Sequence, residues 1–258
     1  MKKRRRETKK DVSRKQMLVI MLSLMIAIAL LVFAALVRRQ KSLVSSEAAR
    51  PSASSEPSDP GRQYRTTNVE LADAGDIPVV HSYIPWGSAR RPGEVREIRY
   101  IVIHETDNRR DSADAEAHNT YLTENGTDIT AWHYTVDDHS IYHNIPDNEI
   151  AWNAGDNRTK DGGNMNGIGI ELCVNIGNDY DATLANGAML AASLMKAYDL
   201  TPDDLRLHED FMDKICPHRM ITEGRVSVFQ QMVKDDYAQL MQEAEPTAVP
   251  QASAEAEE

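Results

Sequence analysis

Residues 17–37 (MLVIMLSLMIAIALLVFAALV) form an apolar run of 21 residues that contains no charge, no glycine and no proline. About 20 consecutive apolar residues suffice to cross the hydrocarbon core of a bilayer as a helix. A helix buried in a globular core would show a polar face, whereas this run contains a single serine. The sequence therefore predicts a transmembrane helix over residues 17–37 rather than a core helix.

A cleaved signal peptide is the competing interpretation of this run. Its apolar core would span roughly 7–15 residues before a small-residue cleavage site. The present run is longer, and Arg38, Arg39 and Lys41 follow it directly, so we favour an uncleaved anchor. Nine Lys or Arg residues precede the run and three follow it. The positive-inside rule then places a basic tail, residues 1–16, in the cytoplasm and the rest outside. We expect a single-pass protein of the cell membrane.

Charge is distributed very unevenly along the chain of 258 residues. The first 41 residues hold 12 of the 29 basic residues and two of the 40 acidic residues. The remainder therefore carries 17 basic and 38 acidic residues. Such an acidic excess argues against a nucleic-acid partner for the folded part.

Composition also predicts the domain boundaries. Residues 38–76 begin with a stretch rich in Ser, Pro and Ala, which is typical of a flexible linker. Residues 242–258 are acidic and rich in Pro and Ala, which predicts a disordered tail. Residues 77–241 lie between them, and we expect one α/β domain there. We find no internal repeat and expect a monomer.

Hydrophobic patterns within this domain predict strands and helices. Apolar or β-branched runs indicate strands at 98–104, 132–137, 140–145 and 168–174, with a hairpin across Asp138 and His139. Helical spacing indicates helices at 112–123, with Ser112 as N-cap, and at 182–198. A last helix is expected from Thr222 or Glu223 to Met241. A strand-rich centre with helices packed on it follows.

Three side chains have the chemistry of zinc ligands. His104 ends an apolar strand, while His208 and Cys216 lie in the run LHEDFMDKICPHRM. Neutral imidazole and thiolate are ligands that Zn²⁺ prefers, and catalytic zinc sites keep three protein ligands. A strand-end His is often only a partly buried polar residue, so the residue types alone leave this site open.

Glu171 and Cys173 lie in the apolar run IGIELCV. A carboxylate among apolar neighbours is costly unless it is paired or functional. Glu171 is therefore either a solvent-facing residue at a strand end or a general base. Outside the cytoplasm Cys173 and Cys216 could form a disulfide, but that bond would remove a zinc ligand, so we favour a buried structural thiol for Cys173.

These motifs occur together and in a specific order. The runs IVIHET, AWHYTVDDHSIYHNIPDNEIAW, AGD, IGIELCVN and KICPHRM resemble the zinc-dependent N-acetylmuramoyl-L-alanine amidases of type 2, the peptidoglycan-recognition-like fold. Within that family the sequence is most similar to the phage and prophage lysins of Gram-positive bacteria. The resemblance covers about residues 98–235 and implies a mixed central β-sheet flanked by α-helices.

The resemblance also implies roles for individual residues. His104, His208 and Cys216 match the three zinc ligands. Glu171 matches the catalytic glutamate, and Lys214 matches a lysine that stabilises the oxyanion; a surface lysine among acidic neighbours is the alternative for Lys214. The implied reaction is hydrolysis of the amide bond between N-acetylmuramic acid and L-alanine in peptidoglycan.

Two further positions are candidate substrate contacts. His133 matches a recurrent family position near the groove, although a packed strand histidine is an equal alternative. Asn153 stands in AWNAGD where many relatives have His, which changes a substrate contact rather than a zinc ligand. A peptidoglycan receptor without activity and a zinc hydrolase for another amide are the remaining alternatives. We favour the amidase because all five ligand and catalytic residues are present.

Overall fold

The computed structural model describes residues 62–124 and 126–244. The predicted basic tail, the apolar run 17–37, the first part of the linker and almost all of the C-terminal tail lie outside the described residues. Within the described ranges, no helix is long and apolar enough to cross a membrane.

The centre of the domain is a seven-stranded sheet with the strand order β1-β2-β5-β4-β6-β3-β7. β3 is parallel to β6 and β7, β4 is parallel to β6, and β5 is antiparallel to β4, so the predicted mixed sheet is confirmed. The strands are β1 Asp73–Ala74, β2 Ile77–His81, β3 Tyr100–Glu105, β4 Tyr134–Val136, β5 Ile141–His143, β6 Gly167–Leu172 and β7 Leu205–Leu207.

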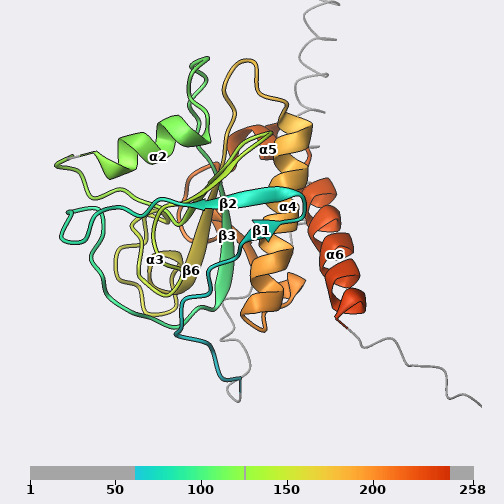
Figure 1. Ribbon diagram of the computed structural model, residues 1–258, viewed down its shortest axis with the longest axis horizontal. Helices are drawn as coiled ribbons and strands as arrows, with labels where there is room; N and C mark the ends of the chain where they lie inside the picture. The colour runs from blue at the N-terminus through green and yellow to red at the C-terminus, as the bar shows by residue number, and fades with distance from the viewer. Residues whose placement is uncertain (1–61, 125, 245–258) are drawn as a thin grey trace, which may run out of the picture. The chain divides into compact units, whose positions relative to one another are not determined.

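Helices cover both faces of this sheet. They are α2 Ala115–Thr123, α3 Gly163–Asn166, α4 Tyr180–Ala197, α5 His218–Thr222 and α6 Val226–Glu243. Figure 1 shows α4 and α6 side by side on one side of the sheet and α2 on the other. The two buried clusters follow this division, because Leu184 and Phe229 belong to the larger one and Leu122 to the smaller one.

Alternation along the strands decides which side chains meet which layer. Ile101 and Ile103 of β3 and Ile170 of β6 join the cluster beneath α4. His104 and Glu171 therefore face the opposite side, where α2 lies. Because β3 and β6 pair with His104 beside Glu171, the sheet register brings these two predicted site residues together.

The N-terminal boundary of the domain differs from the prediction. Tyr64, Val69 and Leu71 pack against the core, and Arg62 forms an ion pair with Asp204 at 2.9 Å. Residues 62–76 therefore belong to the folded domain and not to the predicted linker over 38–76. The reason is that these scattered apolar side chains find buried partners that local composition does not reveal.

Two helix boundaries also differ. The N-cap of α2 is Asp114, whose carboxylate accepts a hydrogen bond from the backbone N–H of Ala117 at 2.8 Å, and not Ser112. The predicted last helix corresponds to α6, which begins at Val226 and not at Thr222 or Glu223, because the separate short helix α5 ends at Thr222 and Gly224, with a φ of +69°, lies between the two. The α6 helix then continues through Glu243, two residues beyond the predicted domain end.

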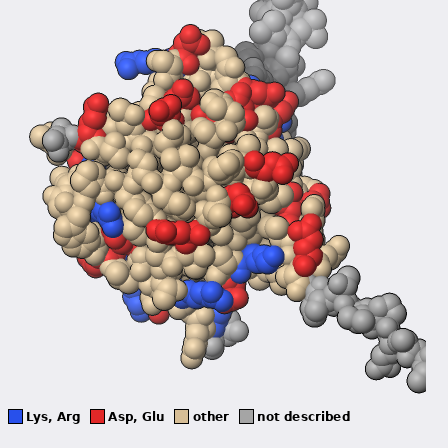
Figure 2. Space-filling model, viewed as in Figure 1, with Lys and Arg blue, Asp and Glu red and all other residues tan. Residues whose placement is uncertain are grey.

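Figure 2 shows the charges on one face of the domain. Acidic side chains gather toward the side of α4 and α6, and the basic side chains visible on this face are scattered. Much of the remaining surface in this view is uncharged.

Candidate active site

The three predicted zinc ligands lie together and are buried. The ligand atoms of His104, His208 and Cys216 all lie within 4.8 Å of one another. His104 is on β3, His208 follows β7, and Cys216 precedes α5. β3 and β7 are adjacent parallel strands with Ile103 beside Leu207, which places the next residues, His104 and His208, side by side.

The two imidazoles face each other through Nδ1 atoms 3.0 Å apart. Burial, together with His208 and Lys214, lowers the pKa of His104 well below its usual value. Burial and the charge of Lys214 lower the pKa of His208 to about 4. Both rings are therefore neutral at physiological pH, which is the form that binds metals.

The Cys216 side chain supplies the third candidate ligand, a buried thiol. Burial and the charge of Glu171 raise the pKa of its thiol to about 12, whereas a backbone hydrogen bond from Glu105 opposes that rise. A bound divalent cation deprotonates a coordinating thiol. The buried Nε2 of His104 has no hydrogen-bond partner among the described residues. Two neutral imidazoles and a thiol in a buried cluster fit Zn²⁺.

Glu171 lies beside His104 on the neighbouring strand. Its Oε2 atom is buried and has no hydrogen-bond partner within the described part of the chain, although the residue as a whole keeps some exposure. Burial raises the pKa of Glu171 to about 8, and the positive charge of Lys214 opposes this rise. With this pKa the carboxyl group is mostly protonated at neutral pH, so it can accept a proton from a neighbouring water once a nearby cation favours its ionised form.

Lys214 is exposed and lies close enough to interact electrostatically with Glu171, His104 and His208. The loop that carries it ends at Cys216, and the backbone N–H of Lys214 bonds to the Met212 carbonyl at 2.7 Å. The structure therefore brings the five predicted ligand and catalytic residues into one region.

Asn153 lies over the strand that carries Glu171. A Cβ added at Gly169 would stand 1.6 Å from Asn153 Nδ2, so only glycine leaves room for this amide. Gly169 and Glu171 share a face of β6. Both polar atoms of the Asn153 amide are buried and lack a hydrogen-bond partner among the described residues. This side chain therefore lies beside the candidate site.

His133 is placed differently from the prediction of a substrate contact. Its side chain is fully buried. Its Nδ1 accepts the backbone N–H of Gly169 at 3.0 Å, and its Nε2 donates to the Glu149 carbonyl at 2.9 Å. Both ring nitrogens thus contact the backbone, and Nε2 also lies 3.1 Å from Arg96 Nη2, so His133 is the packed histidine of the alternative interpretation.

Both cysteines are free and buried. Burial raises the pKa of the Cys173 thiol, so this side chain is an inert thiol at neutral pH. The predicted division between a structural Cys173 and a separate Cys216 agrees with this arrangement.

Sequence reasoning missed Glu105, the residue after His104. Its buried carboxylate accepts the backbone N–H groups of Arg219 at 2.6 Å and Met220 at 3.0 Å, and also the hydroxyl of Tyr180. These bonds fix the segment that begins with Cys216. The signal available in the sequence was a second charged residue at the end of an apolar strand.

Known proteins resemble this chain over much of the folded domain. The family model for N-acetylmuramoyl-L-alanine amidase matches residues 94–219. The amidase XlyA of Bacillus subtilis (strain 168) is 37% identical over 145 residues, which cover 56% of this chain and 48% of XlyA. The amidase CwlH of the same strain is 33% identical, with 56% of this chain and 57% of CwlH covered. The chain thus spans about half the length of these curated relatives.

A solved structure shows the same similarity over a whole catalytic domain. The structure of the catalytic domain of XlyA aligns with a TM-score of 0.57 and 34% identity, and covers 61% of this chain and 99% of that domain. The resemblance identified in the sequence is confirmed. The chain belongs to the N-acetylmuramoyl-L-alanine amidase family.

Proposed function

We propose that this protein is a zinc-dependent N-acetylmuramoyl-L-alanine amidase that acts on peptidoglycan. The observation that carries the proposal is the buried group of His104, His208 and Cys216 beside the unpaired carboxylate of Glu171. Family membership supports the bond that is cleaved, and the similarity to XlyA and CwlH supports the substrate.

His104, His208 and Cys216 would hold the metal. When bound, Zn²⁺ would lower the pKa of a coordinated water toward about 7 and polarise the scissile carbonyl. Glu171 accepts a proton from the attacking water and passes it to the departing amine of L-alanine. Cation charge nearby also lowers the pKa of Glu171 and so favours its basic form. Lys214 stabilises the negative charge that develops on the carbonyl oxygen.

A peptidoglycan receptor without activity is the alternative from a different class. Such a receptor would need a surface that binds peptidoglycan, but it would not need a complete set of metal ligands and catalytic groups. The chain retains all five residues in one region, which favours the enzyme.

Replacement of Glu171 tests the mechanism. We expect purified full-length Glu171→Gln to lose wall digestion by at least about 10²-fold, because general acid–base catalysis supplies about that much. We expect one zinc per chain to remain by elemental analysis, whereas Cys216→Ser loses it. The exposed Glu116→Gln on α2 is the matched control. Undiminished release of peptide stems by Glu171→Gln, seen by mass spectrometry, would refute the general-base role.

We further propose that residues 17–37 anchor the protein in the cell membrane, with residues 1–16 in the cytoplasm and the amidase domain outside. The uncharged run and its flanking basic residues support this orientation. We expect the full chain to stay in the membrane pellet after alkaline carbonate extraction, and external protease to digest the domain in protoplasts. Recovery in the soluble fraction would contradict the anchor.

We propose that the protein acts as a monomer and has no nucleic-acid partner.

A further inference from the structure

A pocket of about 450 Å³ lies between α2 and the segment that follows β3. Thr106 belongs to its lining and comes two residues after the metal-ligand candidate His104. Two residues of extended chain span about 7 Å, and Thr106 continues the ladder because its N–H bonds to the Leu172 carbonyl at 3.1 Å. The pocket therefore adjoins the proposed catalytic site.

Trp132 also lines this pocket, and it is hydrogen-bonded to β4, the strand next to the one that carries Glu171. Its indole N–H donates to the Thr135 hydroxyl at 2.7 Å. Thr135 on β4 is the register partner of Glu171 on β6. A substrate held against the Trp132 ring would thus lie within one or two strand spacings of the proposed general base.

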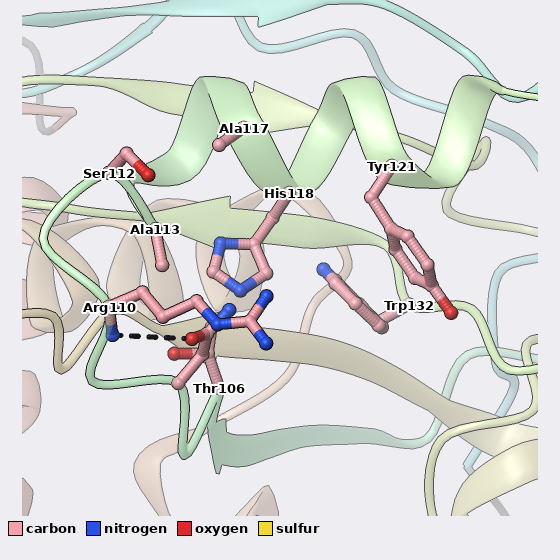
Figure 3. A pocket seen from close by; sticks show the side chains of 9 residues that line it. Thr106, Arg110, Ser112, Ala113, Ala117, His118, Tyr121 and Trp132 are labelled. Atoms are coloured by element: carbon pink, nitrogen blue, oxygen red, sulfur yellow. Dashed lines mark hydrogen bonds between the residues drawn. The ribbon is translucent and has the colours of Figure 1, made fainter.

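Arg110 supplies the positive charge of the pocket. Figure 3 shows its guanidinium extending across the pocket below His118 and toward Trp132. Among the described residues, no carboxylate pairs with this exposed guanidinium, and the hydrogen bonds of Arg110 are made by its backbone, whose N–H donates to Asn108 Oδ1 and whose carbonyl accepts the N–H of Ala113. By contrast, Arg90 and Arg91 nearby in sequence pair with Asp128 and Glu149. An unpaired arginine over a cavity favours an anionic ligand.

Two neutral polar groups complete the lining. The Thr106 hydroxyl oxygen is buried and has no partner within the described residues. His118 Nδ1 donates to the Asp114 carbonyl at 2.7 Å, so the neutral ring leaves Nε2 as an acceptor, and Figure 3 shows that nitrogen pointing into the pocket. Burial lowers the pKa of His118, which keeps the ring neutral.

We infer that this pocket binds an acidic residue of the peptide stem, with Arg110 and the Thr106 hydroxyl on its free carboxylate. The inference rests on the proposed function, because the stem must extend from the bond that is cut. His118 Nε2 accepts an amide N–H of the same residue, and the Trp132 ring packs on its aliphatic part. A residue one or two positions beyond L-alanine reaches this distance, since an extended peptide advances about 3.3 Å per residue.

A pair of matched substrates tests this inference. Both are muramoyl-L-alanyl peptides, and the residue after L-alanine carries either a free carboxylate or the corresponding primary amide. We expect the zinc-loaded full-length protein to cleave the acid with the higher kcat/KM. Arg110→Ala should lower kcat/KM for the acid about 10- to 100-fold, the usual effect of losing one charged hydrogen-bond partner, and change it less than about threefold for the amide.

Arg109→Ala is the matched control, because Arg109 is an exposed neighbour with the same charge that does not line the pocket. It should leave both substrates unchanged. Arg110→Lys should retain part of the preference, since a lysine keeps the charge but not the planar fork. Equal losses on both substrates, or the same loss in Arg109→Ala, would overturn the assignment of Arg110.

A binding measurement separates failure of this inference from failure of the proposed function. Calorimetry on the Glu171→Gln variant would compare the acidic and amidated peptides with and without Arg110→Ala. Tighter binding of the acid that depends on Arg110 supports the pocket even if the wild type cleaves neither substrate. Cleavage of both substrates with no dependence on Arg110 would leave the amidase function standing and refute the pocket.

Discussion

At the scale of single residues, the last two residues of β3 have different roles. His104 belongs to the candidate metal site, and Glu105 holds the segment that carries another candidate ligand. Neighbouring strand residues point to opposite faces. His104 therefore faces the metal-ligand cluster, while Glu105 faces the side of the sheet that α4 covers. The Glu105 carboxylate holds the backbone N–H groups of Arg219 and Met220. These residues follow Cys216 by three and four positions, so Glu105 positions the third ligand against the first.

Glu105→Gln should weaken both the fold and the metal site. The amide has one acceptor oxygen where the carboxylate has two, so one of its three donors loses its partner. We expect a loss of about 1–3 kcal/mol in unfolding free energy and a loss of about 10- to 100-fold in zinc affinity. Urea denaturation and competition with a zinc chelator measure the two effects.

Glu223→Gln is the control for that variant. Glu223 pairs with the Arg219 side chain at 2.9 Å on the surface, and such exposed pairs contribute little. Zinc affinity that is the same in Glu105→Gln and Glu223→Gln would show that Glu105 does not position Cys216.

At the scale of elements, strongly patterned segments were predictable and short ones were not. The strands at 98–104, 132–137, 140–145 and 168–174 and the helix at 182–198 all occur, with boundaries that differ by a few residues. By contrast, β7 has three residues and is specified by pairing with β3, which no local pattern reveals.

The metal-ligand candidates could be predicted from residue type and motif. For His133 the sequence left a packing role and a substrate contact as equal alternatives, because tertiary contacts with Gly169 and Glu149 decide between them.

The break between α5 and α6 depends on Gly224. Its φ of +69° follows α5, and the N–H of Arg225 bonds to the Met220 carbonyl at 2.8 Å, as in a Schellman motif. No heavy atom would lie within 4 Å of an added Cβ among the described residues. The cost of a side chain is therefore conformational and not steric crowding by neighbours.

Gly224→Ala should destabilise the domain by about 1 kcal/mol, because alanine disfavours the left-handed region. Gly224→Asn should lose less, since asparagine adopts this conformation more readily. Denaturant midpoints at constant slope measure the difference. Equal stability of Gly224→Ala and wild type would show that the helix break does not require glycine.

At the scale of the whole molecule, the two faces of the sheet have different roles, one in the apolar core and the other in the candidate site. One face packs on α4 and α6 and carries most of the apolar core, whereas the other holds the site and the pocket beneath α2. The site face contains buried histidines, and their environment links the stability of the whole domain to pH.

His133 should make a large contribution to that pH dependence. Burial and the nearby charge of Arg96 lower the pKa of His133 to about 3 in the fold, against about 6.5 in an unfolded chain. Between these values the unfolded state binds more protons, so stability rises with pH. The contribution is therefore complete above about pH 6.5 and is lost progressively as the pH falls toward 3, with a total of several kcal/mol.

His133→Gln should flatten the fall in unfolding free energy below pH 6.5, although it lowers stability at pH 7 by disturbing the bonds to Gly169 and Glu149. Urea denaturation between pH 5 and 7 compares it with wild type, and shared titrations, including any loss of zinc, cancel in the difference.

His139→Gln is the control with the opposite sign. His139 is largely exposed, and its hydrogen bond to Asp138 raises its pKa, so its small contribution is present at low pH and is lost as the pH rises. If His133→Gln and wild type lost stability in parallel below pH 6.5, then another group would be responsible for the acid sensitivity of the domain.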